Sequence, residues 1–354
     1  MRAALLLIGL VASGIPDRAW ADAPKVRSRT AVVIDAGTGE ELYGKDADAV
    51  RPIASTTKIF VAMAVRKHAL DLDGWTTITK ADAREAAGGA RTRLDVGQAF
   101  RNRDLLRAML IASDNRAPTA LARGAGMEPD ALVAAMNDVA KDLGLKKTRF
   151  TDPSGLHGNT STAREMAVAL RAALKDDVLR SIMGQESAEV VSKGGGVHVT
   201  YSSTNVALRA HQYDVVGGKT GYTEPAGYCL VTAARINKRD VVMAFYGGDS
   251  KGARFADFNK LAGWLEHTAR SPVEATLAAA GAAIDSIAPA PASATVDGDE
   301  PEGKAAAVAA SMGPTTVGGA PAAAASVVES ARPAPHKAPA KKRAHRRHHR
   351  PAES

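Results

Sequence analysis

Two side chains with complementary chemistry stand three residues apart in RPIASTTKIFVAMAV, residues 51–65. The hydroxyl of Ser55 could attack an amide carbonyl if a base removed its proton, and Lys58, one helical turn further on, can reach it. An unperturbed lysine has a pKa near 10.4, so only about 0.04% of it is free base at pH 7. Lowering that pKa to neutrality costs roughly 4.6 kcal/mol, which burial and neighbouring positive charge can supply.

The same pair is unusual as the start of a helix. A Ser or Thr cap is normally followed three positions later by Glu or Gln, as Thr162 is by Glu165. Lys58 instead places a cation at the positive end of the helix dipole. That end of the helix and the apolar flank from Ile59 to Val65 would both help to lower the lysine pKa. The spacing alone leaves open whether the pair is a nucleophile with its base or an unusual helix cap, because a lone Ser-x-x-Lys is expected by chance about once in a chain of this length.

Two further polar clusters follow along the chain, in the order Ser113-Asp114-Asn115 and Lys219-Thr220-Gly221. Each cluster alone fits a helix cap, a turn or a surface strand. Gly221 has no side chain to stop a ligand from lying against its strand. Together and in this order, S-x-x-K, S-D-N and K-T-G form the known signature of penicillin-binding proteins and class A β-lactamases.

With these motifs, the sequence resembles the serine D-Ala-D-Ala peptidases, the low-molecular-mass penicillin-binding proteins, across about residues 28–268. The segments DPSGLHGNTSTARE, STNVAL, GGKTGYTEPAGYCLV and RFADFNKLAGWLE extend the likeness. Several of these, with GARTRLDVG and IASDNRAPTALA, are most similar to the periplasmic D,D-endopeptidase branch. The resemblance implies an α+β, DD-peptidase/β-lactamase-like fold: a five-stranded antiparallel sheet flanked by helices, with a helical lobe and the site between them.

The resemblance also implies the catalytic roles. Ser55 would form an acyl-enzyme, Lys58 would act on its hydroxyl, and Ser113 would relay a proton to the leaving amine. Which base acts first is disputed for such enzymes in general. Asp114 has no assigned role, and we expect it to be structural.

Substrate binding follows from the same likeness. Asn115 would hold the substrate amide while touching Lys58, and Lys219 and Thr220 would receive the terminal carboxylate beside Gly221. The backbone N–H groups of Ser55 and Tyr222 would form the oxyanion hole, an arrangement that commonly supplies several kcal/mol. Peptidoglycan stem peptides are the expected substrates, β-lactams are expected covalent inhibitors, and no cofactor is expected.

The ends of the 354-residue chain differ from its middle. Residues 1–23 read as a secretory signal peptide, with a basic start, a short apolar run and small residues before Asp22. Residues 24–270 are the expected catalytic domain. Residues 271–354 contain no Phe, Tyr or Trp and are rich in Ala and Pro, so we expect a disordered tail. These features predict a secreted protein of the periplasm or cell envelope without a transmembrane anchor.

The formal net charge of +8 lies almost entirely in that tail. Residues 336–350 carry seven Lys and Arg and no acidic residue, which leaves +1 for the rest. The globular part thus gives no reason to expect nucleic-acid binding. The basic end could bind anionic envelope polymers, or it could serve only as a solvated tail. The single cysteine, Cys229, permits no internal disulfide.

Apolar spacing independently indicates an α+β arrangement. RTAVVIDAGTGEELYG predicts a hairpin over residues 29–44, the region from residue 55 to about 170 is mostly helical, and strands return at YCLVTAARI and DVVMAFYG. FADFNKLAGWLEH predicts a last helix. Early and late strands around a helical middle favour one antiparallel sheet closed by both ends of the chain.

Rival functions fit the sequence less well. A class A β-lactamase needs a Glu that activates the deacylating water, and no Glu-x-x-Leu-Asn pattern lies between Asn115 and Lys219. A non-catalytic peptidoglycan-binding homologue would not need all three motifs intact. The nine histidines show no metal-ligand spacing. Endopeptidase and carboxypeptidase activities both remain open, and the absence of an amphipathic C-terminal anchor favours the endopeptidase.

Overall fold

The computed structural model describes residues 23–90 and 92–268. The expected signal lies outside these residues except for Ala23, and the expected tail lies wholly outside them. The elements run in this order: β1 (Thr30–Asp35), β2 (Glu41–Lys45), β3 (Arg51–Pro52), η1 (Ala54–Thr57), α2 (Lys58–Lys67), β4 (Trp75–Thr77), α3 (Lys80–Glu85), β5 (Ala99–Arg101), α4 (Asn102–Ala112), α5 (Ala117–Gly124), α6 (Pro129–Asp142), β6 (Thr160–Ser161), α7 (Ala163–Ala173), α8 (Asp177–Met183), β7 (Ser187–Val191), β8 (His198–Ser202), α9 (Val206–Ala210), β9 (Asp214–Thr223), β10 (Gly227–Ile236), β11 (Arg239–Gly248) and α10 (Ala253–Thr268).

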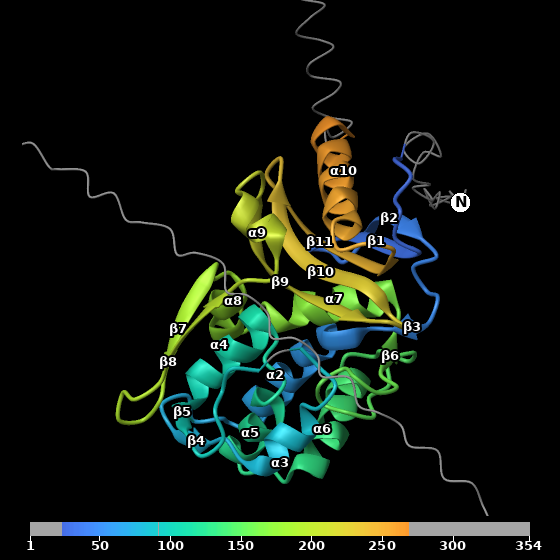
Figure 1. The fold of residues 1–354 in the computed structure, drawn as a ribbon. Helices are drawn as coiled ribbons and strands as arrows, with labels where there is room; N and C mark the ends of the chain where they lie inside the picture. Colours follow the sequence, from blue (N-terminus) through green and yellow to red (C-terminus); the bar gives the residue numbers. More distant parts are fainter. Residues whose placement is uncertain (1–22, 91, 269–354) are drawn as a thin grey trace, which may run out of the picture. The chain divides into compact units, whose positions relative to one another are not determined.

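A five-stranded antiparallel sheet in the order β2-β1-β11-β10-β9 lies between α10 and α7 (Figure 1). The first strand, β1, pairs with β2 on one edge and with the last strand, β11, on the other, so both ends of the described chain meet in the sheet. This confirms the predicted fold class and the predicted hairpin. β10 and β11 are joined through Asn237 and Lys238, both at positive φ, as the tightest antiparallel hairpins require.

Alternation along the strands gives the sheet two apolar faces. In β1, Val32 and Ile34 belong to one buried cluster, and Ala31 and Val33 to another. The helix α7 packs against the first face, and α10 packs against the second, at β10 and β11. The sheet is therefore covered on both sides, as Figure 1 shows.

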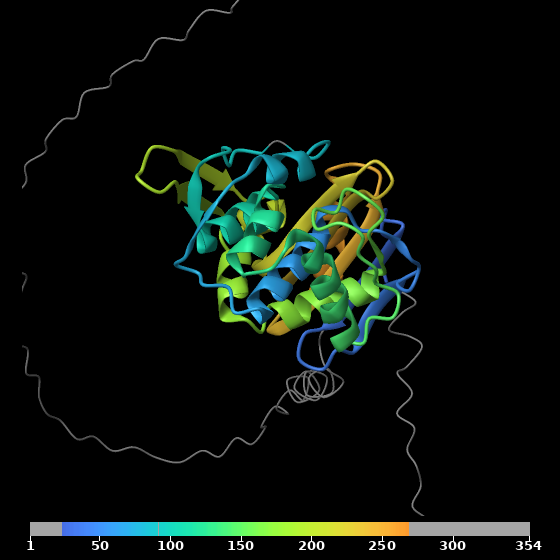
Figure 2. The same ribbon diagram turned by 90° about the horizontal axis from the view of Figure 1, so that it is seen from below.

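The helical lobe is built around α2, whose side chains from Ile59 to Ala62 are completely buried. α4, α5, α6 and α7 all contact α2, and Figure 2, seen from below, shows it enclosed by them. Two small two-stranded sheets, β4–β5 and β7–β8, extend the lobe. Among the described residues, no helix is both long and apolar enough to cross a membrane.

The capping box expected at the start of α7 is only half formed. The Thr162 side chain accepts a bond from Glu165 N, but the Glu165 carboxylate accepts from Lys147 N and the Thr148 hydroxyl instead of reaching back to the cap. A complete capping box occurs at Thr79, ahead of α3. Tertiary partners thus replaced the local bond that the sequence pattern predicted.

Candidate active site

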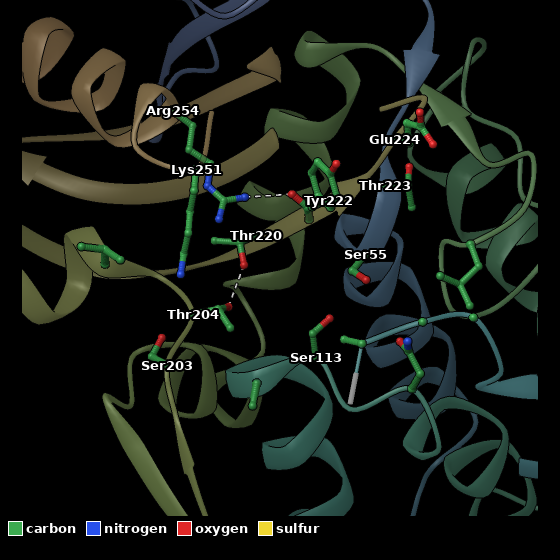
Figure 3. Close-up of a pocket in the computed structure, with 18 of the residues that line it drawn as sticks. Ser55, Ser113, Ser203, Thr204, Thr220, Tyr222, Thr223, Glu224, Lys251 and Arg254 are labelled. Carbon is green, nitrogen blue, oxygen red and sulfur yellow. Dashed lines mark hydrogen bonds between the residues drawn. The ribbon is translucent and has the colours of Figure 1, made fainter. Parts of the chain in front are cut away.

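A cleft of about 730 Å³ lies where η1, the turn after α4 and the strand β9 meet (Figure 3). Six of the eight residues predicted from the sequence line it, namely Ser55, Ser113, Asn115, Thr220, Gly221 and Tyr222. The other two, Lys58 and Lys219, are almost completely buried. The fold therefore brings together three motifs that are far apart in the sequence.

Ser55 and Lys58 are in direct contact, with Lys58 Nζ 2.9 Å from Ser55 Oγ. Ser55 belongs to the 3₁₀ turn η1 and caps no helix, so its hydroxyl is not engaged with a helix end. The residue before it, Ala54, has φ +49°, an uncommon value for a residue with a side chain. Such strain costs on the order of 1–3 kcal/mol and clusters at functional sites.

The Lys58 amine is poised near neutrality. Burial lowers its pKa to about 7, against the opposing attraction of the Asp152 and Asp114 carboxylates. Burial also holds the pKa of Lys219 well below its usual value, reinforced by repulsion from Lys58 and Arg254. A buried lysine near pKa 7 carries a large free-base fraction, as a general base requires. The predicted cause, desolvation, is thus the main one.

Ser113 and Asn115 present unused polar atoms to the cleft. Ser113 ends α4 in the left-handed region at φ 66°, which turns the chain toward the cleft. Within the described residues, neither Ser113 Oγ nor Asn115 Oδ1 has a hydrogen-bond partner. The contact between Asn115 and Lys58 that the family likeness implied is therefore not made through Oδ1. Buried polar atoms without partners are uncommon, so both are suited to receive a ligand.

Asp114 has the structural position expected for it. Its carboxylate accepts bonds from the backbone N–H of Arg93, from the Tyr201 hydroxyl and from Arg116 N. The Arg93 guanidinium also lies 4.2 Å from the centre of the Tyr201 ring. Asp114 thereby attaches the turn after α4, on which Ser113 and Asn115 lie, to the neighbouring strand β8.

On β9, Thr220 and Lys219 differ in what they expose. Thr220 lines the cleft, and its hydroxyl donates to Thr204 Oγ1 at 2.6 Å. Lys219 is 1% exposed, and its Nζ donates to the Thr220 carbonyl oxygen at 2.8 Å. Lys219 therefore lies behind the strand with its amine on the strand's own backbone, while Thr220 presents a hydroxyl to the cleft.

Gly221 lets the strand β9 approach the Ser55 backbone. A Cβ on Gly221 would lie 3.0 Å from Ser55 N and 3.0 Å from the Ala54 Cβ. The missing side chain is needed for packing against η1, which the sequence reasoning, concerned with a ligand, did not anticipate. The result is that Ser55 N and the strand segment at Tyr222 are held close together.

We expect Gly221→Ala to slow acylation by a fluorescent penicillin at least tenfold and to lower the Tm by a few degrees. The added methyl must displace β9 from Ser55 by a few tenths of an ångström, and small displacements of reacting groups are costly. Stopped-flow acylation and thermal unfolding measure the two effects. Gly196→Ala is the matched control, because a Cβ there meets nothing within 4 Å. An unchanged acylation rate in Gly221→Ala would contradict this account.

Arg254, in the first turn of α10, is a cleft residue that sequence reasoning missed. Its guanidinium donates to the carbonyl oxygens of Gly221 and Cys229, both at 2.8 Å, and lies near the rings of Tyr228 and Phe255. Figure 3 shows the Arg254 guanidinium directed toward the β9 strand, with Lys251 extending beside it. A cation in the first turn of a helix, the signal used for Lys58, could have identified it.

The segment from Ala87 to Ala90 forms another wall that was not predicted. Gly89 lies directly on Asn115, since a Cβ there would be 1.9 Å from Asn115 Nδ2. The glycines of AAGGA were the available signal, because a backbone approaching a neighbour closely requires them. Across the described residues, no group of three or more His, Cys, Asp or Glu could hold a metal ion.

Comparison with known proteins agrees with this geometry. Residues 17–250 match the D-alanyl-D-alanine carboxypeptidase family, peptidase family S11. The D-alanyl-D-alanine endopeptidase of Pseudomonas aeruginosa is 34% identical over 68% of this chain and 78% of its own length. The D-alanyl-D-alanine endopeptidase of Escherichia coli is 30% identical over 72% of this chain and 82% of its own length.

A solved structure, the Streptomyces K15 DD-transpeptidase, covers 68% of this chain and 98% of its own with a TM-score of 0.64 at 30% identity. The fold and the cleft thus define a serine peptidase of the penicillin-binding type. The chain belongs to the D-alanyl-D-alanine carboxypeptidase family, peptidase family S11.

Proposed function

We propose that this protein is a serine D,D-peptidase that cleaves D-Ala-D-X bonds in peptidoglycan stem peptides through an acyl-enzyme on Ser55. The observation that carries the proposal is the contact between Ser55 Oγ and the buried Lys58 amine, 2.9 Å apart, with the lysine pKa near 7. A hydroxyl beside a neutral amine is an activated nucleophile.

In the proposed acylation, Lys58 takes the proton of the Ser55 hydroxyl as Oγ bonds to the carbonyl carbon of the penultimate D-Ala. The backbone N–H groups of Ser55 and Tyr222 stabilise the resulting oxyanion. Ser113, whose Oγ has no partner among the described residues, relays the proton held by Lys58 to the leaving nitrogen as the C–N bond breaks, so that Lys58 is neutral again. Water then attacks the ester carbonyl as Lys58 takes its proton, and that proton passes to Ser55 Oγ as the ester bond breaks and the peptide leaves as a carboxylate.

Cationic and hydroxyl groups at one end of the cleft suit the carboxylate of the leaving residue. Thr220 supplies a hydroxyl, while Arg254 and Lys251 supply positive charge from α10 and the turn before it. Lys219 supports the strand from behind through its bond to the Thr220 carbonyl oxygen, and Gly221 keeps the strand against Ser55. Asn115 is placed to hold the substrate amide through its free Oδ1.

The same cleft accounts for β-lactams as covalent inhibitors, since they carry an acylating carbonyl and a carboxylate. A β-lactamase is disfavoured because no carboxylate among the described residues is hydrogen-bonded to Ser55 or Lys58, and the cleft wall's one carboxylate is that of Glu224. Glu224 lies just beyond the end of β9. An acyl-enzyme that no carboxylate helps to hydrolyse persists, which suits inhibition better than β-lactam turnover.

We favour the D,D-endopeptidase activity, with removal of terminal D-Ala as a second activity. The relatives named D-alanyl-D-alanine endopeptidase match over most of their length, although a D-alanyl-D-alanine carboxypeptidase of Mycobacterium tuberculosis is also 33% identical. The cleft continues past Tyr222 to Thr223, Glu224 and Lys251, which leaves room for a leaving residue larger than alanine.

The proposed protein has three parts: a signal peptide at 1–23, the peptidase domain at 24–270 and an Ala/Pro-rich tail at 271–354. Export to the periplasm or cell envelope would place the cleft beside peptidoglycan. The tail's seven cations would bind anionic envelope polymers. No nucleic-acid partner, metal or cofactor enters the proposal.

Mass spectrometry of purified peptidoglycan after digestion tests the proposed activity. Cross-linked dimers converted to monomers would establish the endopeptidase, and loss of one terminal alanine from pentapeptides would establish the carboxypeptidase. Unchanged muropeptides, with penicillin acylation intact, would contradict both activities and favour a peptidoglycan-binding role.

A further inference from the structure

A tight turn from Asp152 to His157 touches the Ser55–Lys58 pair from behind. Lys58 Nζ donates to the Ser154 carbonyl oxygen at 2.6 Å, a shorter distance than to Ser55 Oγ itself. The Ser55 hydroxyl lies 3.5 Å from the same carbonyl oxygen. One backbone carbonyl thus contacts both members of the reacting pair.

The Asp152 carboxylate holds this turn together. One of its oxygens accepts from Ser154 N, the Ser154 hydroxyl and Gly155 N at 2.6–2.7 Å, and the other accepts from His157 N at 2.7 Å. Asp152 is only 5% exposed. Burial raises its pKa, but the Ser154 hydroxyl and the backbone N–H groups outweigh burial, so the carboxyl remains ionised.

Gly155 and Asn159 fix the turn against η1. Gly155 has φ +87°, and a Cβ on it would lie 2.1 Å from the Ala54 carbonyl oxygen. The Asn159 amide donates to the Asp152 carbonyl oxygen and to the Thr57 hydroxyl. The position of the Ser154 carbonyl relative to Ser55 is therefore set by packing and by hydrogen bonds, with Asp152 at their centre.

We propose that Asp152 is a positioning residue for the acylation step, acting through the Ser154 carbonyl oxygen to orient the Lys58 amine toward Ser55. A neutral amine has two N–H bonds and one lone pair. When one N–H points to Ser154, the lone pair can face the Ser55 hydroxyl and take its proton. This inference rests on the proposed roles of Ser55 and Lys58.

Asp152 also acts on Lys58 through its charge. The titratable groups that face Lys58 are the Asp152 carboxylate from this turn, the Asp114 carboxylate from the turn after α4 and the Lys219 amine from β9, whose own pKa is held well below its usual value. Both carboxylates favour the protonated amine and therefore raise the Lys58 pKa. Loss of the Asp152 charge lowers that pKa, so the acidic limb of the pH–rate profile moves to lower pH.

The test is the pH dependence of acylation by a chromogenic cephalosporin between pH 5 and 9. Asp152→Asn should move the acidic limb down by about one pH unit and reduce the plateau rate about tenfold, because charge and turn geometry are both altered. Asp152→Glu keeps the charge but not the geometry, so its limb should return toward the wild-type position while its plateau stays low.

Asp257→Asn is the matched control. Asp257 is also a buried carboxylate that accepts from two backbone N–H groups and a serine hydroxyl, those of Arg27 and Ser28, but it lies on α10. It should lose similar stability and leave the acidic limb unmoved. If Asp152→Asn behaves like Asp257→Asn, with lowered Tm and an unmoved limb, Asp152 is merely structural and the proposal is overturned.

Ser154→Ala keeps the proposal testable if Asp152→Asn does not fold. This substitution removes the hydroxyl bond to the Asp152 carboxylate but keeps the Ser154 backbone carbonyl. The plateau rate of acylation should therefore fall severalfold, and the acidic limb of the pH–rate profile should not move. An unchanged plateau overturns the proposal. If the wild-type pH–rate profile shows no acidic limb near pH 7, the proposed role of Lys58 is overturned together with that of Asp152. If the limb is present and only the Asp152 variants fail to behave as expected, the role of Asp152 alone is overturned.

Discussion

Ser55→Ala should eliminate covalent labelling by fluorescent penicillin and reduce peptidase activity by at least about four orders of magnitude, as loss of a catalytic nucleophile does. Within the described cleft, the Ser55 hydroxyl is the one in contact with a buried lysine amine, at 2.9 Å. Ser113 and Ser203 also line the cleft, but no hydrogen bond joins either hydroxyl to a lysine amine there. Gel fluorescence and intact-protein mass measure the loss of label.

Ser202→Ala is the matched control, since Ser202 is an exposed serine on β8 outside the cleft. It should label like the wild type. Full labelling of Ser55→Ala would remove Ser55 as the nucleophile, and peptide mapping of the labelled protein would then identify the serine that is acylated.

Lys58→Met should lower the acylation rate by a factor of about 10²–10⁴, the range that general-base catalysis supplies. Methionine has a similar length and suits the fully buried position, so the fold should persist.

In the wild type, acylation should fall about tenfold per pH unit below pH 7 and level off above it. The reason is that protonated Lys58, with its pKa near 7, cannot take the Ser55 proton.

The Lys58 experiment needs the same pH series for the wild type and the variant. Lys58→Met should lose the acidic limb together with the rate, whereas Lys238→Met, on the exposed β10–β11 turn, should keep both. A Lys58→Met enzyme that retains the wild-type rate would show that another group accepts the proton, and Lys219 would be the next candidate.

The residues with a local signature could be predicted from the sequence. Ser55 and Lys58 are one turn apart, and the other two motifs are contiguous triplets, so short-range spacing was sufficient. The fold class followed from strands at both ends and helices between them. Six of the predicted residues line the cleft, although their individual roles remain predictions for the variants described here.

The remaining features depend on contacts that no local pattern encodes. The Ser154 carbonyl reaches Lys58 across 96 positions of sequence, and it does so with a backbone atom that every residue possesses. Arg254 enters the cleft from the first turn of α10, and it is held there by the carbonyl oxygens of Gly221 and Cys229, which lie on two strands of the sheet. The deep burial of Lys219 could not be predicted either, because the sequence of a strand does not indicate which of its lysines are exposed to solvent.

The strand order has a consequence for how the chain folds. β1 lies between β2 and β11, so its second edge stays unpaired until residues 239–248 have been synthesised and have docked. Closing so long a loop is entropically costly, and pairings so distant in sequence form slowly. Ser55 and Lys58 therefore lie together early on one short segment, while β9 reaches them only when the sheet assembles. Acquisition of β-lactam reactivity during refolding would therefore report the docking of β9 and the closure of the sheet.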